Sequence, residues 1–250
     1  MRIIADTNVW YELGNNQQLL DSVRCEPITP TFVSLSELTL SGNMVMKEAE
    51  VQAACRAMMR FGRNLILDPP FIHLAKILKG YEFDGEATFA DKLEVAARLA
   101  NGGGVAPEHR ETFREVISHK RAVFEGGADV FNREAQRIRA QIADKKNEHL
   151  AIDSIPLVAG FIDYCVRETT NQGITLEDAP LKGFELLLVV LDAFFKKMEV
   201  TQMSFKGNDW NDIALLAYVQ PGDRLWTSEG RWRNLINEVG MSDYLYNPSR

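Results

Sequence analysis

Short apolar runs alternate with helical stretches at both ends of the chain, and this pattern constrains the fold more than any other feature of the sequence. The expected strands are residues 2–5, 29–33, 64–67, 224–227 and 244–246. Such alternation predicts a parallel sheet with helices on both of its faces. Residues 86–170 carry only helical signals, and we expect helix breaks at the glycines of 102–104 and 126–127.

The domain organisation follows from this division of the chain. With 250 residues, of which 46% are apolar and 25% charged, the chain has the composition of a globular protein and is not typical of disorder. We predict an α/β fold in which residues 1–80 and 181–250 form one discontinuous domain. Residues 81–180 then form a large, all-helical insertion.

Cysteine usage and hydropathy indicate the compartment. The three cysteines are far apart in the sequence and form no CxxC pair, which favours free thiols in a reducing environment. The N-terminal apolar run is too short for a secretory signal. The longest apolar run, residues 186–191, is far below the ~20 residues of a transmembrane helix. We therefore expect a cytoplasmic protein with no membrane partner.

Acidic side chains occur where the expected strands end or the following helices begin. They are Asp6, Glu37, Asp209, Asp212 and Glu229. Each has an ordinary structural explanation. Asp6 can cap the next helix, and Glu37 can close a capping box with Ser34. Asp209 and Asp212 can stabilise a first helical turn, and Glu229 can be a solvated loop residue.

Taken together, four of these carboxylates indicate a metal site, because parallel strands bring their carboxyl ends to one edge of the sheet. Asp6, Glu37, Asp212 and Glu229 would then repel one another strongly at neutral pH. Divalent cations relieve that repulsion, and all-oxygen ligands suit Mg²⁺ or Mn²⁺. Two such ions can activate water and clamp the oxygens of a phosphodiester. A phosphatase that forms an aspartyl-phosphate is disfavoured, because Asn8 stands where that chemistry needs a second acid.

Four short motifs in this order resemble the PIN-domain family. They are Asp6-Thr7-Asn8-Val9-Trp10, Ser36-Glu37-Leu38, Asp212-Ile213-Ala214 and Thr227-Ser228-Glu229. The resemblance implies a three-layer α/β/α fold and a nuclease that uses Mg²⁺ or Mn²⁺, most often on RNA. It makes four residues both catalytic and metal-binding: Asp6, Glu37, Asp212 and Glu229. Asn8 and Thr227 would support the site. Asp209 competes with Asp212 as a ligand, and Asp212 is favoured because the apolar run begins directly after it.

Charge is distributed unevenly along the chain. The net charge is −7, which argues mildly against a duplex-binding protein, yet residues 110–146 carry nine basic and six acidic groups. We predict that this window contacts RNA phosphates through Arg133, Arg137 and Arg139. Its alternative is a solvated helix surface with local ion pairs. A catalytically inactive nucleic-acid-binding or scaffold protein is the alternative to the nuclease. The sequence leaves open a homo-oligomer or a protein inhibitor as further partners.

Overall fold

The computed structural model of the chain describes residues 1–250 except 83–85, 145–153, 171–173, 177–178 and 249–250. Its strands are β1 (Ile3–Ala5), β2 (Ile28–Thr29) and β3 (Arg224–Trp226). Its helices are α1 (Thr7–Asn15), α2 (Gln17–Ser22), α3 (Phe32–Thr39), α4 (Asn43–Met46), α5 (Glu48–Phe61), α6 (Pro70–Lys79), α7 (Glu86–Ala100), α8 (Arg110–Asp144), α9 (Ile155–Thr170), α10 (Glu185–Val200), α11 (Asp209–Leu216) and α12 (Gly230–Glu238). Short 3-10 turns are η1 (Pro107–His109), η2 (Leu181–Phe184) and η3 (Ser242–Tyr244).

A small parallel sheet lies at the centre, with the strand order β2-β1-β3. Single parallel bridges extend it at both edges, from Thr31 to Ile66 and from Leu225 to Leu245. All five expected strands therefore contribute to the sheet, although residues 64–67 and 244–246 provide only one bridge each. The expected strand 29–33 is too long, because α3 already begins at Phe32. The predicted α/β class with a parallel sheet is confirmed.

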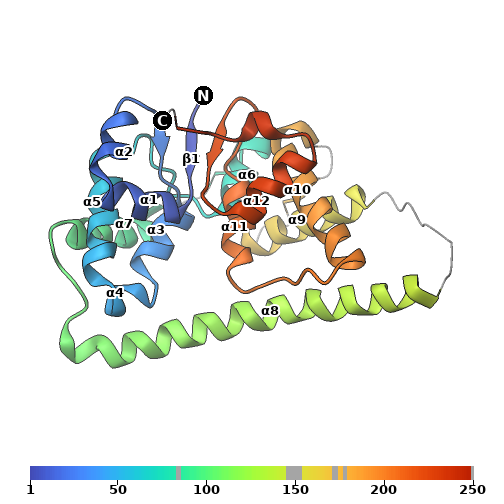
Figure 1. The fold of residues 1–250 in the computed structure, drawn as a ribbon, viewed down its shortest axis with the longest axis horizontal. Coiled ribbons are helices and arrows are strands. Elements are labelled where there is room, and N and C mark those ends of the chain that lie inside the picture. The colour runs from blue at the N-terminus through green and yellow to red at the C-terminus, as the bar shows by residue number, and fades with distance from the viewer. Residues whose placement is uncertain (83–85, 145–153, 171–173, 177–178, 249–250) are drawn as a thin grey trace.

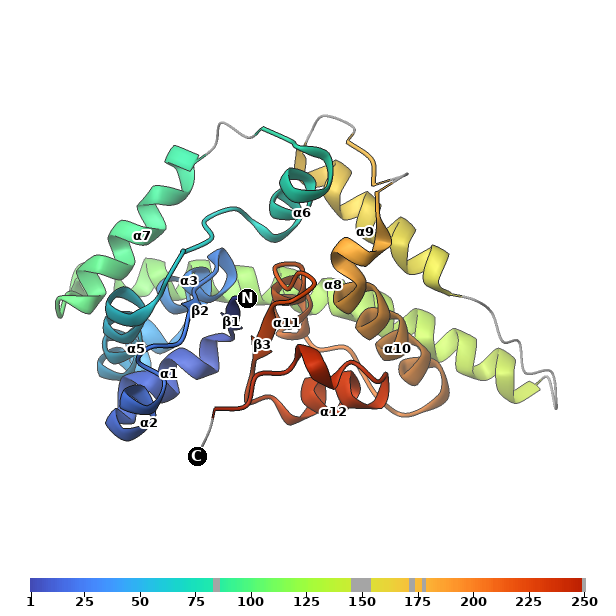
Figure 2. The same ribbon diagram turned by 90° about the horizontal axis from the view of Figure 1, so that it is seen from above.

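Helices cover both faces of this sheet, as Figure 2 shows. On one face, Ile3 and Ala5 pack into a core that includes side chains of α1, α3, α5 and α7. On the other face, Ile4 packs into a second core built from α6, α9, α10, α11 and α12. Successive side chains of a strand point to opposite faces, so the fully buried β1 contributes to both cores.

Close packing and helix-end signals explain several of the helices. A Cβ on Gly14 of α1 would lie 2.6 Å from the carbonyl carbon of Ala53, so glycine there allows α1 to pack tightly against α5. Helix α6 begins with Pro70 in its first turn and ends at Gly80, whose φ of +65° is favourable only for glycine. Among the described residues, no helix is both long and apolar enough to cross a membrane.

The described part of residues 81–180 is helical, as expected, but its helices pack closely on their surroundings. Helix α7 contacts α3 and α5, while α9 contacts α6 and α10. The cores on both faces of the sheet therefore include side chains from this region. The division into a nuclease domain and a separate insertion stays a prediction.

Helix α8 runs without a break through Gly126 and Gly127, so the predicted helix end at these glycines is wrong. Figure 1 shows α8 as one long rod along an edge of the molecule. A Cβ on Gly127 would lie 3.2 Å from the ring of Trp210, and the indole Nε1 of Trp210 donates to the carbonyl of Phe124 at 3.1 Å. The need for close packing against Trp210 therefore explains Gly127 better than a turn does. Residues 145–146 of the basic window lie outside the described residues.

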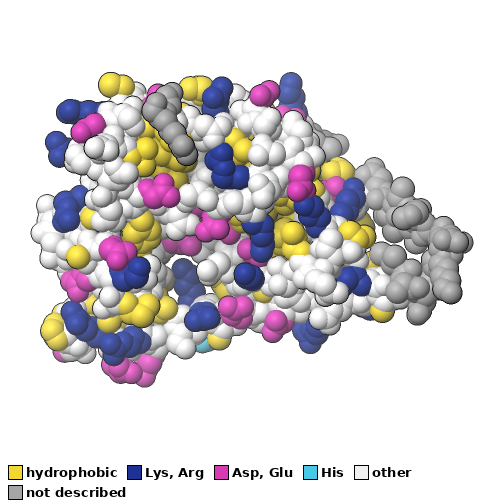
Figure 3. All heavy atoms as spheres, in the orientation of Figure 1, with side chains coloured by type: hydrophobic (Ala, Val, Ile, Leu, Met, Phe, Trp, Pro, Cys, Tyr) yellow, Lys and Arg dark blue, Asp and Glu magenta, His cyan; other side chains and the backbone are white. Residues whose placement is uncertain are grey.

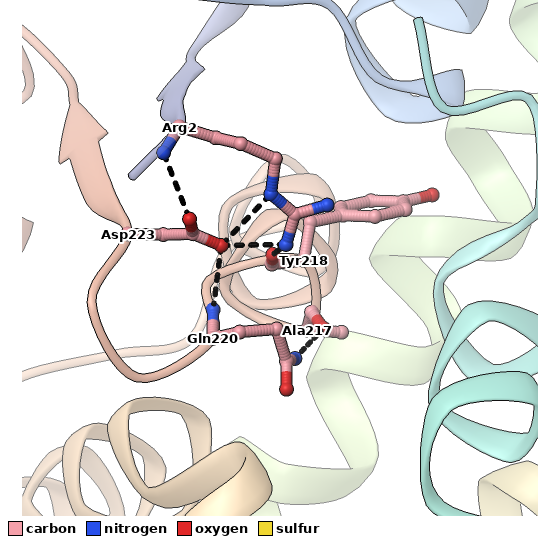
Figure 4. A network of polar contacts seen from close by, with 5 residues as sticks. All are labelled: Arg2, Ala217, Tyr218, Gln220 and Asp223. Carbon is pink, nitrogen blue, oxygen red and sulfur yellow. Dashed lines mark hydrogen bonds and ion pairs between the residues drawn. The ribbon is translucent and has the colours of Figure 1, made fainter. Parts of the chain in front are cut away.

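A partly buried ion pair joins β1 to the turn before β3 at the amino ends of the two strands (Figure 4). Asp223 is buried and accepts from the backbone N–H of Arg2 at 2.9 Å and from its guanidinium at 2.5 and 3.0 Å. The same carboxylate accepts from the backbone N–H of Gln220 at 3.3 Å. One side chain thus fixes the start of β1 and the turn into β3.

The first prediction concerns this pair. We expect Asp223→Asn to lower the free energy of unfolding by about 1–3 kcal/mol, because it leaves donors of Arg2 without a charged acceptor. Urea denaturation measures the change, and Asp243→Asn, at an exposed position, is the matched control. An unchanged denaturation midpoint for Asp223→Asn would contradict the structural role of the pair.

Candidate metal centre

Asp6 lies at the carboxyl end of β1, between the strand and α1. It occupies the cap position of α1 and is buried, yet its side chain makes no capping hydrogen bond. Its Oδ2 instead accepts from the hydroxyl of Thr227 at 2.9 Å. The backbone N–H of Asp6 donates to the carbonyl of Trp226 at 2.9 Å, which aligns the ends of β1 and β3. Helix capping therefore does not account for this carboxylate.

Glu37 belongs to α3, and the capping box at the start of that helix does not include it. Thr31 and Ser34 form the box, with the Thr31 N–H donating to Ser34 Oγ at 3.0 Å and the Ser34 N–H donating to Thr31 Oγ1 at 3.3 Å. The predicted alternative of a Ser34–Glu37 box is therefore wrong. Glu37 is half-buried, and its Oε2 accepts from the hydroxyl of Thr7. Its Oε1 accepts from the amide of Asn211 at 2.8 Å.

The two aspartates of α11 have different surroundings. Asp209 is buried, forms an ion pair of 2.5 Å with Arg231, and accepts from the backbone N–H of Lys206 at 2.7 Å. The pKa of Asp212, by contrast, is raised to about 8. Burial and then the charge of Asp6 contribute most, with smaller contributions from Glu37 and Asp209, while a hydrogen bond from Trp232 opposes the shift. Asp209 thus has a cationic partner in Arg231, whereas Asp212 lies among carboxylates and its raised pKa keeps it mostly protonated at pH 7.

Glu229 lies after β3, at the exposed side of the same group. Its Oε1 accepts from the amide of Asn8 at 2.9 Å. Its backbone N–H donates to the hydroxyl of Thr227 at 3.1 Å, and that hydroxyl donates in turn to Asp6. Asn8 and Thr227 therefore link the acidic side chains that follow β1 and β3, which is the placement that the sequence predicts for supporting residues.

Electrostatic coupling shows that these acidic residues lie near one another. The pKa of Asp6 is raised to about 6, mainly by burial and further by the charges of Glu37 and Glu229, against a hydrogen bond from Thr227 that lowers it. Burial also raises the pKa of Glu37, against the hydrogen bonds from Thr7 and Asn211. Figure 3 shows Asp and Glu side chains gathered on the face of the molecule above α8.

The donor set suits a divalent cation, although the ligands are not preassembled. Within the described residues, no group of three or more His, Cys, Asp and Glu side chains forms a ready-made metal site. Neutral hydroxyl and amide donors instead hold the carboxylates individually. All of the candidate donors are carboxylate oxygens, which are the ligands that Mg²⁺ and Mn²⁺ favour. The residues that could hold such an ion are Asp6, Glu37, Asp212 and Glu229.

The three predicted phosphate-binding arginines lie elsewhere on α8. Arg137 pairs with Glu134 one turn earlier, and Arg133 donates to the carbonyl of Asp129 at 3.3 Å. Arg139 donates to the carbonyl of Met198 at 2.8 Å, at the end of α10. Their contacts are thus with α8 itself and with α10, and the structure does not bring them to the carboxylates. Their role in nucleic-acid binding stays a prediction.

Several residues of the site have no predicted role in the sequence. Thr7 and Asn211 orient Glu37, and each directly adjoins a predicted acid, so the motifs themselves carry a signal for them. Arg231 and Lys120 have no such signal. Arg231 pairs with Asp209, and the charge of Lys120 on α8 lowers the pKa of Glu37. Both reach the site only through tertiary packing.

Comparisons of the chain with protein-family models, with curated proteins and with solved structures give no match. The site is therefore interpreted from its own geometry and chemistry.

The second prediction uses the raised pKa of Asp212 in metal-free protein. A carboxyl whose pKa is higher in the folded than in the unfolded state stabilises the fold only while it is protonated. We therefore expect the folded state to lose stability, relative to Asp212→Asn, as the pH rises from 7 to 9. The difference amounts to about 1 kcal/mol.

Urea denaturation in the presence of a chelator measures this effect at pH 7 and 9. The comparison starts at pH 7 because burial lowers the pKa of His73 to about 4, and that histidine changes stability with the opposite sign below about pH 6.5. Asp243→Asn controls for the loss of one surface charge. The same free energy difference between wild type and Asp212→Asn at both pH values would show that Asp212 titrates normally.

Proposed function

We propose that the chain is a Mg²⁺- or Mn²⁺-dependent nuclease with a three-layer, PIN-like α/β/α domain, which hydrolyses RNA phosphodiester bonds. One observation carries the proposal. Asp6, Glu37 and Asp212 come from β1, α3 and α11, are buried or half-buried, and have raised pKa values. Burying like charges together opposes folding, so this arrangement is better explained by a ligand that needs the charges than by stability.

The position of the group in the fold supports the same proposal. In parallel α/β sheets, ligands bind outside the carboxyl ends of the strands. Asp6 follows β1 directly, and Thr227 and Glu229 follow β3, which is the parallel neighbour of β1. Asp6 and Glu229 thus follow adjacent parallel strands, while Glu37 and Asp212 come from α3 and α11.

Each residue of the site has a distinct task in this proposal. Asp6, Glu37, Asp212 and Glu229 would hold the divalent ions. Such ions supply charge neutralisation, water activation and a clamp on the phosphodiester oxygens. Thr7 and Asn211 orient Glu37, while Thr227 orients Asp6. Asp209 is not counted as a ligand, because Arg231 already neutralises it.

The third prediction concerns metal binding without catalysis. We expect millimolar Mn²⁺ to raise the melting temperature of the wild type, because a ligand that binds only the folded state stabilises it by RT ln(1 + [L]/Kd). A concentration one hundred times the Kd corresponds to about 2.7 kcal/mol. Asp212→Asn should lose most of this gain. Asp223→Asn makes the same change at the opposite ends of the strands and should keep it.

Calorimetry with and without Mn²⁺ measures this change in melting temperature for each variant. A wild-type melting temperature that does not respond to Mn²⁺ would remove the proposed metal site. An equal gain in Asp212→Asn would show that the ion binds elsewhere.

The fourth prediction concerns activity on a labelled single-stranded RNA. We expect cleavage with Mn²⁺ or Mg²⁺ that a chelator abolishes. Asp6→Asn and Asp212→Asn should lower the rate by more than about 100-fold, because changes to residues that only orient metal ligands already cost roughly 10–100-fold. Thr227→Val, which removes the hydroxyl that orients Asp6, should fall within that lower range.

Asp223→Asn is the matched control, and we expect its rate to equal that of the wild type at a temperature where it remains folded. RNA binding without cleavage under either metal would favour the alternative of an inactive binding protein. Cleavage that survives Asp212→Asn would contradict the assignment of the site.

A further inference from the structure

A groove of about 660 Å³ opens beside Glu37, between α8 and the segment that joins α3 to α4. Its charged lining residues are Glu37, Lys120, Arg121, Glu125 and Lys206, and Asn43 and Asn211 add side-chain amides. Figure 3 shows a hollow above α8, with Lys and Arg side chains in and below it and the gathered acidic side chains above. The groove thus leads from a basic wall to the candidate metal centre.

Helix α8 is attached to the rest of the protein on both sides of this groove. Near its N-terminus, Arg110 pairs with Glu48 of α5 at 3.3 Å. Further along, the Phe124 carbonyl accepts from Trp210 at 3.1 Å. The turns between these two attachments, residues 111–123, form the wall that carries Lys120. The Trp210 contact holds this wall next to α11, the helix that also carries Asp212.

Lys120 is the cation of this wall whose charge acts on Glu37. Its side chain is half-buried, and its ammonium lies 5.6 Å from the ring centre of Phe124. Burial lowers the pKa of Lys120, and the charge of Lys92 on α7 adds to that effect, while Glu37 opposes it. Lys120 is therefore close enough to Glu37 for their charges to interact.

No carboxylate of the described residues lies within ion-pair distance of Lys120. Both oxygens of Glu37 already accept hydrogen bonds, from Thr7 and from Asn211. A partly desolvated ammonium without an ion-pair partner costs free energy, which an external anion would recover. The geometry thus leaves Lys120 available to an anionic group in the groove.

We infer that this groove binds the phosphate backbone of a single-stranded polynucleotide, and that Lys120 holds the phosphate next to the one at the metal centre. The inference that the strand is RNA rests on the proposed function. Lys206 adds a second positive charge to the groove, whereas Arg121 pairs with Glu125 of the same helix at 3.8 Å. Asn43 and Asn211 offer amides to bases or sugars. A groove bounded on one side by a helix attached at two points favours a single strand over a duplex.

In this proposal the nucleic-acid contacts lie in the first half of α8, and not at the three arginines that the sequence predicts. Arg133, Arg137 and Arg139 lie beyond the Trp210 attachment, toward the end of α10. Lys120 and Arg121 precede it and line the groove. The contribution of α8 to binding is therefore local to its first half.

Binding of a fluorescein-labelled single-stranded RNA oligonucleotide, measured by anisotropy in a chelator, tests the groove without catalysis. Lys120→Met keeps the size of the side chain and removes its charge. We expect it to raise the Kd by about tenfold and to flatten the slope of log Kd against log salt by about 0.7, as the loss of one phosphate contact does for a single strand. Lys120→Arg should retain wild-type affinity.

Lys182→Met removes the same charge from an exposed position on η2, away from the groove, and should bind as the wild type does. An equal loss of affinity in Lys182→Met, or wild-type affinity in Lys120→Met, would overturn the inference. If Lys120→Met does not fold, Lys206→Met provides the same test from the opposite wall. A duplex of the same sequence that binds as tightly as the single strand would overturn the preference for a single strand.

Cleavage assays with Mn²⁺ separate this inference from the proposed function. If the wild type does not cleave RNA but Lys120→Met weakens binding, the groove is a binding site and the nuclease proposal fails. If the wild type cleaves RNA and Lys120→Met binds normally, the nuclease proposal stands and the groove assignment is wrong.

Discussion

The pairing of β1 with two parallel neighbours is the constraint on which the rest of the structure depends. Ile3, Ile4 and Ala5 are fully buried, so this short strand must have helices on both faces. Its pairing with β3 brings the two ends of the chain together, and residues 221 positions apart then share a hydrogen bond, from Thr227 to Asp6. The carboxylates therefore meet because the core requires β1 to be central, and not because any local motif assembles them.

This arrangement lowers the stability of the fold at one edge of the sheet, where acidic side chains are buried together. At the amino ends of β1 and β3, Asp223 is neutralised by Arg2, and both strands gain from the pair. At the carboxyl ends, Asp6 and Asp212 have raised pKa values, and the nearby guanidinium of Arg231 is paired with Asp209. The same sheet thus carries a neutralised acid at one end and an acidic group at the other. Active sites commonly retain destabilising residues of this kind, because function selects against their replacement.

The sequence predicts those parts of the structure that depend on local periodicity or on strand order. Five strand positions and the placement of Asp6, Thr227 and Glu229 after strands are of this kind. Two local signals were misleading. The pattern from Ser34 to Glu37 matches a capping box, but Thr31 begins the helix one turn earlier. The glycines at 126–127 match a helix end, but packing against Trp210 explains Gly127 within a continuous helix. Lys120 and Arg231 carry no signal, because their positions depend on which helices meet.

In the proposed function, helix α8 offsets the repulsion between the negatively charged chain and a polyanion. A chain of net charge −7 with an acidic edge repels a polyanion, and the proposed divalent ions would act only at that edge. Some cations on α8 are paired within the helix, as Arg137 is with Glu134, and paired charges contribute little to attraction. A wall that spans the groove places Lys120 next to the acidic residues while Thr7 and Asn211 keep Glu37 engaged. In the proposed site, Lys120 can then supply positive charge next to the metal ligands while Glu37 keeps its own hydrogen-bond partners.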